Sequence, residues 1–346
     1  MIKKPGMVIM AISPRKTTIQ EPHRSQTITL AQRSPSKRYT DHLEGISFHT
    51  DPLRNSTRSL SGSFLEEHFE NGRRYCSQTY YTPNDDEEQT RLAIGHQAYL
   101  PILDGQLTLA HIPRGAKRIL DIGTGTGDWA IAVAERMPNA EIIATDITSA
   151  FQPSTGPPNV FFELDDAQEE WAYNEPFDFI HLRAMSGAFS DWHQIYAEVA
   201  KHLKPGGSFE IVDSGAIELK EGSSDSYVSI YNGAIQSAAE KSGRPLGLDH
   251  LKKPVFEKAG LSVVKSKLYE VPLGPWPDEP QRKVTGKMAM ITALEGLEAA
   301  SLRLLTKHMG WQEQEVRDLC EKVKLEILNG RAYCPCQFIV ARKLMV

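Results

Sequence analysis

Three alternating glycines follow a short apolar run about a third of the way along the chain. The run covers residues 118–122, and Gly123, Gly125 and Gly127 come directly after it. Apolar residues then recur at helical spacing as far as Pro138. A strand that passes through a glycine loop into a helix lets a ligand approach the backbone closely. This unit therefore predicts an α/β domain with a cofactor at the carboxyl end of that strand.

Strand and helix patterns alternate after the glycine loop. Strands are predicted over residues 141–145, 160–164, 177–181 and 208–213, with a helix over residues 191–203. Two later strands, 261–271 and 333–343, enclose a helical insertion over residues 282–328. A helix over residues 83–100 precedes the glycine loop, with Asn84 or Asp85 as its N-cap. The alternation predicts an α/β fold with a doubly wound, Rossmann-like sheet.

The spacing of the glycines and the acids beside them narrow the choice of cofactor. A P-loop is excluded because no Gly-Lys-Ser or Gly-Lys-Thr follows the glycines. Dinucleotide loops read G-x-G-x-x-G, whereas this loop reads G-x-G-x-G between Asp121 and Asp128. Two carboxylates disfavour a pyrophosphate but suit S-adenosylmethionine (SAM), whose amino group and sulfonium are cationic. The charge pattern therefore favours SAM.

Acidic residues also follow the next two predicted strands. Asp146 ends the first of them, where a carboxylate can accept hydrogen bonds from both ribose hydroxyls of NAD or of SAM. Asp165 and Asp166 follow the next strand, before Ala167, where an acid can accept from an adenine amino group. Each acid alone also fits a helix cap or a solvated loop. Acids at three successive strand ends together favour a nucleoside site.

The first 60 residues differ in composition from the rest of the chain. The 346 residues carry a net charge of −5, but residues 1–60 hold ten Lys or Arg and four acids. We predict a disordered basic tail over residues 1–62 and one folded domain over residues 63–346; a mitochondrial transit peptide is the other interpretation of the tail. The net negative charge of the whole chain argues against direct nucleic-acid binding. No apolar run approaches the roughly 18 residues of a membrane span.

The four cysteines predict no metal site. Cys76, Cys320, Cys334 and Cys336 lack the paired C-x-x-C spacing of zinc ligands. We interpret them as free thiols, which are typical of a reducing compartment, and we expect no metal ligand in this chain.

Together these motifs resemble class I SAM-dependent methyltransferases. The glycine loop, Asp146, Asp166 and the segment LKPGGSFEI stand where that superfamily has them. Three further segments, YYTPNDDEEQTRLAIGH, FDFIHLR and VPLGPWP, resemble the LaeA-like fungal methyltransferases, and the likeness covers about residues 65–343. In the first segment the matching positions are Tyr80, Pro83, Asp85, Glu88, Arg91, Leu92 and His96.

The resemblance implies a seven-stranded sheet with an antiparallel last strand, and a helical segment before the core that packs over the cofactor. It implies SAM as the cofactor. The residues expected to bind it are Tyr80, Asp121, Gly123, Thr124, Gly125, Gly127, Asp146, Ile147, Asp165, Asp166, Ala167 and His181. One departure is the loop itself, because the family often continues Gly-Ile-Trp where this chain has Gly127, Asp128 and Trp129.

Six residues have two interpretations each. His181 is the candidate general base for an acceptor that must lose a proton, or it shapes the methionine end of the pocket. Arg183 steers an acidic acceptor or forms a structural ion pair. Trp276 lines the acceptor pocket or anchors a loop. Tyr80, Tyr81 and His96 are candidates for a lid over SAM, with ordinary core packing as the alternative.

Two functions follow from the resemblance. The first is an enzyme that methylates a small molecule, on oxygen before nitrogen or carbon, in fungal secondary metabolism. The second is a LaeA-type nuclear regulator, in which the same fold serves as a subunit of a protein complex. We favour the enzyme, with a small-molecule acceptor as its partner and the cytoplasm as its location; the regulator implies protein partners and the nucleus.

Overall fold

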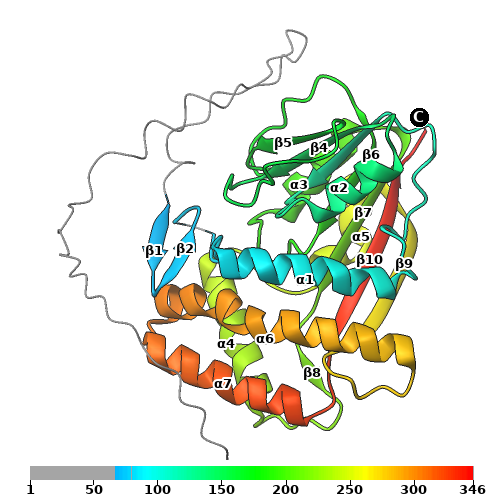
Figure 1. Cartoon of the computed structure of the whole chain (residues 1–346). Helices are drawn as coiled ribbons and strands as arrows, with labels where there is room; N and C mark the ends of the chain where they lie inside the picture. Colours follow the sequence, from blue (N-terminus) through cyan, green and yellow to red (C-terminus); the bar gives the residue numbers. More distant parts are fainter. Residues whose placement is uncertain (1–66, 79, 346) are drawn as a thin grey trace, which may run out of the picture. The chain divides into compact units, whose positions relative to one another are not determined.

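The computed structural model describes residues 67–78 and 80–345 of the chain (Figure 1). The predicted tail over residues 1–62, and the domain boundary at residue 63, lie outside this part. Within it, no helix is long and apolar enough to cross a membrane, and no cluster of three or more His, Cys, Asp or Glu side chains has the arrangement of a metal site. All four cysteines are free thiols.

The main sheet has a parallel half in the order β5-β4-β3-β6-β7. Its strands are β3 (Arg118–Ile122), β4 (Glu141–Asp146), β5 (Val160–Leu164), β6 (Phe177–Arg183) and β7 (Leu203–Ser214). β3 lies in the middle, and the chain runs outward from it to β5 and then crosses back to β6. The strand order therefore reverses between β3 and β6, and the carboxyl ends of the strands beside this point are where open α/β sheets bind ligands.

The last strand of the chain runs antiparallel to the strands beside it, as predicted. β10 (Ala332–Lys343) pairs antiparallel with β7 and, on its other edge, with β9 (Leu261–Pro272). A two-residue strand, β8 (Glu218–Leu219), pairs with the first residues of β10 and makes the sheet eight-stranded. The seven predicted strands are thus present, and the expected Rossmann-like fold with an antiparallel last strand is confirmed.

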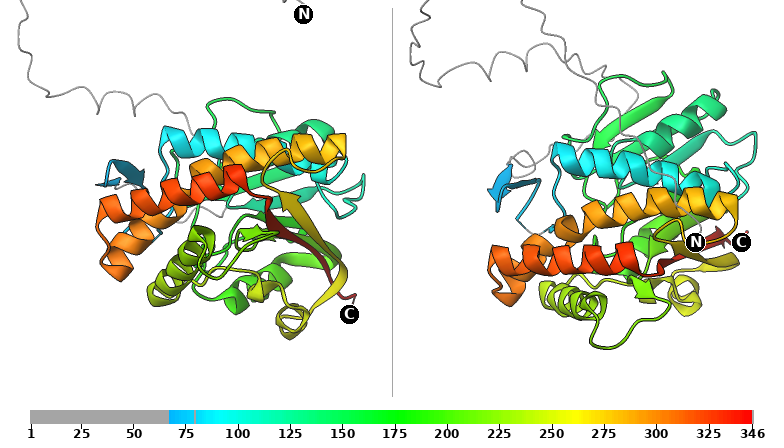
Figure 2. Two further views of the ribbon diagram at one scale, coloured as in Figure 1. Left: turned by 90° about the horizontal axis from the view of Figure 1, so that it is seen from below. Right: turned by 60° about the horizontal axis from the view of Figure 1, so that its bottom comes forward.

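The two faces of the parallel strands carry separate cores, because neighbouring side chains of a strand point in opposite directions. Ile119 and Ile142 pack with α2 (Asp128–Arg136) on one face. Leu120 and Ile143 pack on the other face with α3 (Trp192–His202) and α5 (Lys253–Lys258). Figure 2 shows the sheet from two further sides. The helices on both faces explain why these strands are apolar along their whole length.

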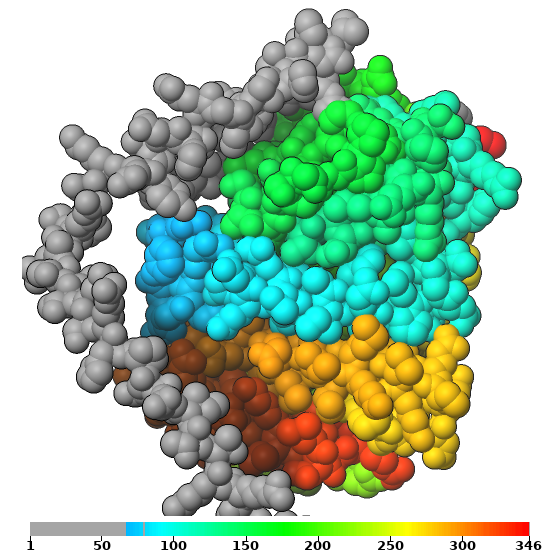
Figure 3. Space-filling model, viewed as in Figure 1, coloured from blue at the N-terminus to red at the C-terminus, as the bar shows by residue number. Residues whose placement is uncertain are grey.

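A third core joins the helices outside the sheet. α4 (Tyr227–Ser242), α6 (Pro280–Met309) and α7 (Glu313–Asn329) bury their apolar sides together with residues of β10. α6 also contacts α1 (Asp86–Ile102) along its length. In Figure 3, α1 in cyan and α6 in orange lie side by side on the surface. The predicted insertion is therefore two helices, α6 and α7, whereas α4 is an element that the sequence analysis did not predict.

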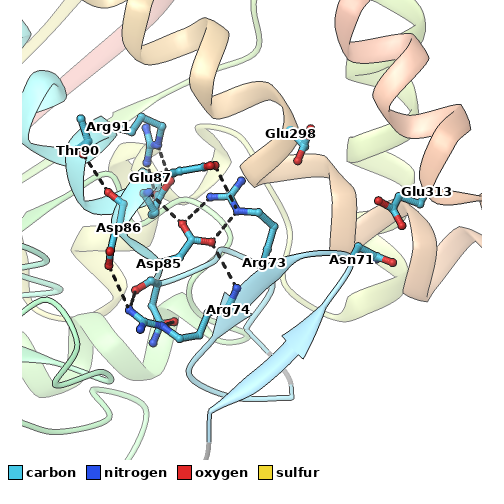
Figure 4. A network of polar contacts seen from close by, with 12 residues as sticks. Asn71, Arg73, Arg74, Asp85, Asp86, Glu87, Thr90, Arg91, Glu298 and Glu313 are labelled. Atoms are coloured by element: carbon cyan, nitrogen blue, oxygen red, sulfur yellow. Dashed lines mark hydrogen bonds and ion pairs between the residues drawn. The ribbon is translucent and has the colours of Figure 1, made fainter. Parts of the chain in front are cut away.

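A small hairpin holds the beginning of α1. It consists of β1 (His68–Glu70) and β2 (Arg73–Tyr75), joined by a turn at Asn71 and Gly72. Asp85 caps α1 by accepting a hydrogen bond from the Glu88 backbone N–H, and it also accepts two hydrogen bonds from Arg73, at 2.6 and 2.8 Å (Figure 4). The same carboxylate thus fixes both the helix and the hairpin, and of the two predicted N-cap residues Asp85 is the one used.

Two boundaries differ from the prediction in a way that affects the site. The strand expected over residues 177–181 continues to Arg183, so His181 lies inside β6 rather than at its end. The fifth strand begins at Leu203 instead of 208, because Leu203 already pairs with Phe177 at the start of β6. Pro205, Gly206 and Gly207, which were interpreted as a turn, lie in an irregularity of this strand before its pairing with β6 resumes at Ser208.

Gly127 permits close contact between α2 and β5, and its replacement should destabilise the fold. It has a φ of +78°, and a Cβ atom there would lie 2.6 Å from the ring of Phe162. We expect Gly127→Ala to lower the free energy of unfolding by about 2–4 kcal/mol, from left-handed strain and overpacking together. Urea denaturation measures this. Gly72→Ala is the matched control, since Gly72 has the same φ but no atom within 4 Å of the added Cβ, and we expect about 1 kcal/mol there. Equal effects of the two substitutions would contradict the packing role.

Candidate active site

Two cavities meet along the glycine loop. The larger, of about 620 Å³, lies at the carboxyl ends of β4 and β5; we call it the nucleoside cavity. The smaller, of about 380 Å³, lies between α1, α4, α6 and the strands β7 and β10; we call it the apolar cavity. Both are lined by Gly123, Gly125, Arg91 and Arg183. A molecule in one cavity therefore lies next to a molecule in the other.

Asp146 is the central acid of the nucleoside cavity. One of its carboxylate oxygens accepts a hydrogen bond from the Gly125 backbone N–H at 2.9 Å, and the other accepts from the Thr148 backbone N–H at 3.1 Å. Burial raises the pKa of Asp146 to about 6, although these backbone hydrogen bonds oppose the change. A carboxylate oxygen has more than one acceptor site, so both oxygens still have capacity for a ligand's hydroxyl groups.

The other acids of the nucleoside cavity come from the end of β5. Asp165, Asp166 and Ala167 all line it, and the Asp165 backbone N–H donates to the Asp146 carbonyl oxygen at 2.9 Å. Asp166 accepts a hydrogen bond from the Gln168 backbone N–H at 2.9 Å, which fixes this loop. Of the acids predicted at three successive strand ends, those after β4 and β5 thus surround one cavity, whereas Asp121 of β3 lines the other.

His181 is held in a defined orientation below the glycine loop. Its Nδ1 lies 2.8 Å from an Asp121 carboxylate oxygen, and its ring stacks on Trp129 with 3.8 Å between the ring centroids. Thr124 donates to the second Asp121 oxygen at 2.7 Å. Burial lowers the pKa of His181, which favours the neutral ring, while Asp121 acts in the opposite direction. A neutral ring that donates from Nδ1 to a carboxylate carries a lone pair on Nε2.

The apolar cavity is lined mainly by side chains without charge. Leu92, Ile102, Ile235, Val271 and Leu273 contribute to it, as do small residues of α6. Cys334 and Cys336 line it from β10, and burial raises the pKa of both thiols to about 12, so both are protonated. His181 and Asp128 border it from the side of the glycine loop. The cavity therefore suits an apolar molecule that presents a polar group towards the loop.

A buried arginine of α6 fastens the segment that covers the nucleoside cavity. Arg303 is 1% exposed and donates to the backbone carbonyl oxygens of Ser77 and Tyr80 and to the carboxylate of Glu70. Its guanidinium also lies over the ring of Tyr75, 4.0 Å from the centroid. Ser77, Gln78 and Tyr80 line the nucleoside cavity, and we call these three residues the covering segment. Arg303 thus links α6 to the covering segment, which the sequence analysis did not foresee.

A second buried pair fixes the loop after β6. Asp213, which is fully buried, accepts from the Ser186 backbone N–H at 3.0 Å and lies 2.9 Å from Nε2 of His250. Ser186 in turn donates its hydroxyl to the Gly247 carbonyl oxygen at 3.2 Å. Met185, Ser186 and their neighbours line the nucleoside cavity, so this pair shapes one of its walls. The sequence indicated this pair only through Asp213, which lies near the end of the fifth strand. The first two strands also have acids at that place.

The predicted site residues divide between the two cavities, apart from Gly127. Gly123 and Gly125 border both; Tyr80, Asp146, Ile147, Asp165, Asp166 and Ala167 line the nucleoside cavity; Asp121, Thr124 and His181 line the apolar one. Gly127 lines neither, and packs α2 against β5. Of the two interpretations of Trp276, the structure favours the loop anchor: its indole N–H donates to the Ala332 carbonyl oxygen at 2.9 Å, and it does not line the apolar cavity. Of the lid candidates, Tyr80 and Tyr81 border the nucleoside cavity and His96 borders the apolar one.

Comparison with known proteins agrees with this geometry. Residues 94–265 match the family model described as a methyltransferase domain. The methyltransferase pytC of Aspergillus terreus is 33% identical over 320 residues, which cover 91% of this chain and 98% of that protein. The chain belongs to the class I SAM-dependent methyltransferases. The secondary metabolism regulator LAE1 of Cochliobolus heterostrophus is 31% identical, over 77% of this chain and 91% of that protein. The probable methyltransferase tdiE of Emericella nidulans is 29% identical, over 75% and 82%.

The residues of the nucleoside cavity fit the cofactor that this family implies. Asp146 has acceptor capacity for two ribose hydroxyls, and Asp166 can accept from the adenine amino group. At the start of α2 the Asp128 carboxylate accepts from the Thr126 hydroxyl at 2.5 Å. That is where a dinucleotide would need its pyrophosphate, so the acid disfavours NAD and leaves SAM, whose methionine end carries positive charge.

The methyltransferase should lose cofactor affinity in weak acid because of Asp146. The ionised carboxylate is the form that accepts hydrogen bonds from both ribose hydroxyls, and protonation removes acceptor capacity. Since the pKa of Asp146 is raised to about 6, affinity is full above pH 7 and falls as the pH drops through 6. We expect S-adenosylhomocysteine, the demethylated product, to bind about tenfold more weakly at pH 5 than at pH 7. Calorimetry across this range measures it, with Asp146→Asn as the control whose profile should be flat. Equal affinities of the wild type at both pH values would contradict the assignment.

Proposed function

We propose that this methyltransferase transfers the methyl group of SAM to an oxygen of a small, largely apolar molecule in fungal secondary metabolism. The observation that supports this most is the apolar cavity of about 380 Å³, which meets the nucleoside cavity along Gly123 and Gly125. The surface of this cavity is mainly apolar, so it suits a carbon skeleton rather than a peptide or a nucleic-acid segment. The printed names of pytC and tdiE as methyltransferases agree with this class of activity.

The chain contributes alignment to the reaction. When bound, SAM supplies a methyl group on a cationic sulfur, which is already activated for displacement. α1 and α6 line the apolar cavity side by side, and the glycine loop borders both cavities, so that acceptor and cofactor are held next to each other. An acceptor hydroxyl has to lose its proton during the transfer. We propose that His181 accepts it at Nε2, because Asp121 holds Nδ1 and fixes the tautomer.

Transfer of an isotopically labelled methyl group tests the proposal. The purified full chain is incubated with methyl-labelled SAM and with a panel of apolar phenols and enols, and each product is extracted into organic solvent. We expect label in at least one extracted product, and a loss of about 10²–10⁴ in its rate of formation in His181→Asn. Label that appears only in protein, or in no fraction, would overturn the proposal.

The similarity to LAE1 supports a second candidate, a regulator that acts through protein partners in the nucleus. The two candidates differ in what the basic segment over residues 1–62 does. An enzyme acting in the cytoplasm should turn over its acceptor at the same rate after this segment is removed. A regulator should lose partner binding or nuclear entry. Unchanged turnover together with unchanged localisation in the truncated protein supports the enzyme.

A further inference from the structure

Arg183 is a cation without an anionic partner at the junction of the two cavities. It ends β6 and lines both cavities. Within residues 67–78 and 80–345, no carboxylate forms an ion pair with it; its contacts are Nδ1 of His96 at 3.1 Å and the ring of Tyr99, 4.8 Å from the centroid. Arg91, by contrast, is neutralised by Glu88 at 2.5 and 2.7 Å. The structural ion pair considered for Arg183 is therefore absent from the described residues.

The contact with His96 defines a second hydrogen-bond donor. A guanidinium donates and never accepts, so Nδ1 of His96 must be the acceptor. Burial, with the nearby charge of Arg183, lowers the pKa of His96 to about 4, so the ring is neutral at physiological pH. In a neutral imidazole that accepts at Nδ1, the hydrogen sits on Nε2. His96 therefore adds an N–H donor to those of Arg183, and no group of the described residues accepts from Nε2.

The surroundings of this pair indicate which ligand uses it. His96 and Tyr99, the two residues of α1 that contact the guanidinium, line the apolar cavity and not the nucleoside cavity. Donors that converge at one place, one of them cationic, match a carboxylate, which accepts two hydrogen bonds from an arginine in a planar arrangement. Because the guanidinium is oriented from the apolar side, the carboxylate belongs to the molecule in that cavity.

We propose that Arg183 and His96 bind a carboxylate of the acceptor, so that the acceptor is an apolar hydroxy acid. This inference rests on the proposed function, and it deepens it by naming the substrate class. The carboxylate is held beside α1, while the hydroxyl to be methylated faces His181, which lines the same cavity. Arg183 is then the residue that separates acids from their neutral analogues.

Binding of an acid and its amide tests the inference. The probes are 6-hydroxy-2-naphthoate and 6-hydroxy-2-naphthamide, titrated into the full chain saturated with S-adenosylhomocysteine. We expect the acid to bind at least about tenfold more tightly than the amide, which corresponds to one charge-assisted contact. In Arg183→Gln the ratio should fall to about one, and in Arg183→Lys to an intermediate value. Arg114→Gln, which removes an equally charged side chain from an exposed position, should leave the ratio unchanged.

Three outcomes have distinct meanings. An acid that does not bind the wild type, or binds no better than the amide, overturns the inference. A loss of S-adenosylhomocysteine affinity in Arg183→Gln as large as the loss of acid affinity also overturns it, and assigns Arg183 to the carboxylate of the cofactor. Failure of the wild type to bind S-adenosylhomocysteine is different, since it refutes the proposed function itself.

Discussion

Replacing Asp146 with Ala should weaken binding of S-adenosylhomocysteine by about 100-fold or more. The carboxylate supplies acceptors for two ribose hydroxyls, and each hydrogen bond to a charged group contributes about 1.5–3 kcal/mol. The substitution also frees the backbone N–H groups of Gly125 and Thr148, which Asp146 now fixes. The shape of the glycine loop is therefore lost together with the ribose contacts. Equilibrium dialysis with labelled S-adenosylhomocysteine measures the change.

Asp178→Ala is a matched control for this variant. Asp178 also accepts from two backbone N–H groups, those of Lys117 and Arg118, at 2.8 and 3.0 Å. It lies at the opposite, amino end of the parallel strands, far from both cavities along β6. We expect Asp178→Ala to lower stability and to leave the dissociation constant within twofold of the wild type. An Asp146→Ala protein that folds and keeps wild-type affinity would remove the basis of the cofactor assignment.

Arg303→Ala should destabilise the fold strongly, and it should also weaken cofactor binding. It leaves the carbonyl oxygens of Ser77 and Tyr80 without their donor and Glu70 without its cation. Glu70 is partly exposed, so we expect a loss of about 2–4 kcal/mol, the lower part of the range for breaking a buried pair. Tyr80 borders the nucleoside cavity, so the covering segment should close less firmly over the cofactor. Chemical denaturation with and without S-adenosylhomocysteine measures both effects.

A surface arginine with a similar set of contacts provides the control variant for Arg303→Ala. Arg317 on α7 pairs with Glu298 and Glu313 and donates to the Asn71 carbonyl oxygen, but a third of its side chain is exposed. Figure 4 shows Asn71, Glu298 and Glu313 beside the hairpin. Water replaces such contacts, so Arg317→Ala should cost less than about 1 kcal/mol. If Arg303→Ala costs no more than that, Arg303 does not fasten the covering segment.

The parallel half of the fold was predictable because each element there has a strong local signal. β3 and β5 are apolar runs with acids or glycines at their ends, and their predicted bounds match the structure. The strand ends then placed Asp146, Asp165 and Asp166 around one cavity, since topology brings the carboxyl ends of parallel strands together. The resemblance supplied the antiparallel direction of the last strand, β10, which alternation alone does not determine.

The rest of the fold and of the site could not be predicted from the sequence, because it depends on contacts between distant segments. α4 has a mixed sequence whose apolar side is defined only by packing on α6 and α7, so its periodicity is weak. The sequence analysis did not single out Arg303, because its partners lie more than 200 residues earlier in the chain. Arg183 depends on distant contacts too: its sequence position suggested an ion pair or an acidic acceptor, and only the positions of His96 and Tyr99 favour the second interpretation.

Calorimetric titration of the purified full chain with S-adenosylhomocysteine, and in parallel with NAD, tests the central claim most directly. We predict saturable binding of one S-adenosylhomocysteine per chain with a dissociation constant of about 1–100 µM, and no heat of binding with NAD. Such a result identifies an adenosyl compound as the cofactor. Binding of NAD, or a well-folded protein that takes up neither compound, would contradict the account.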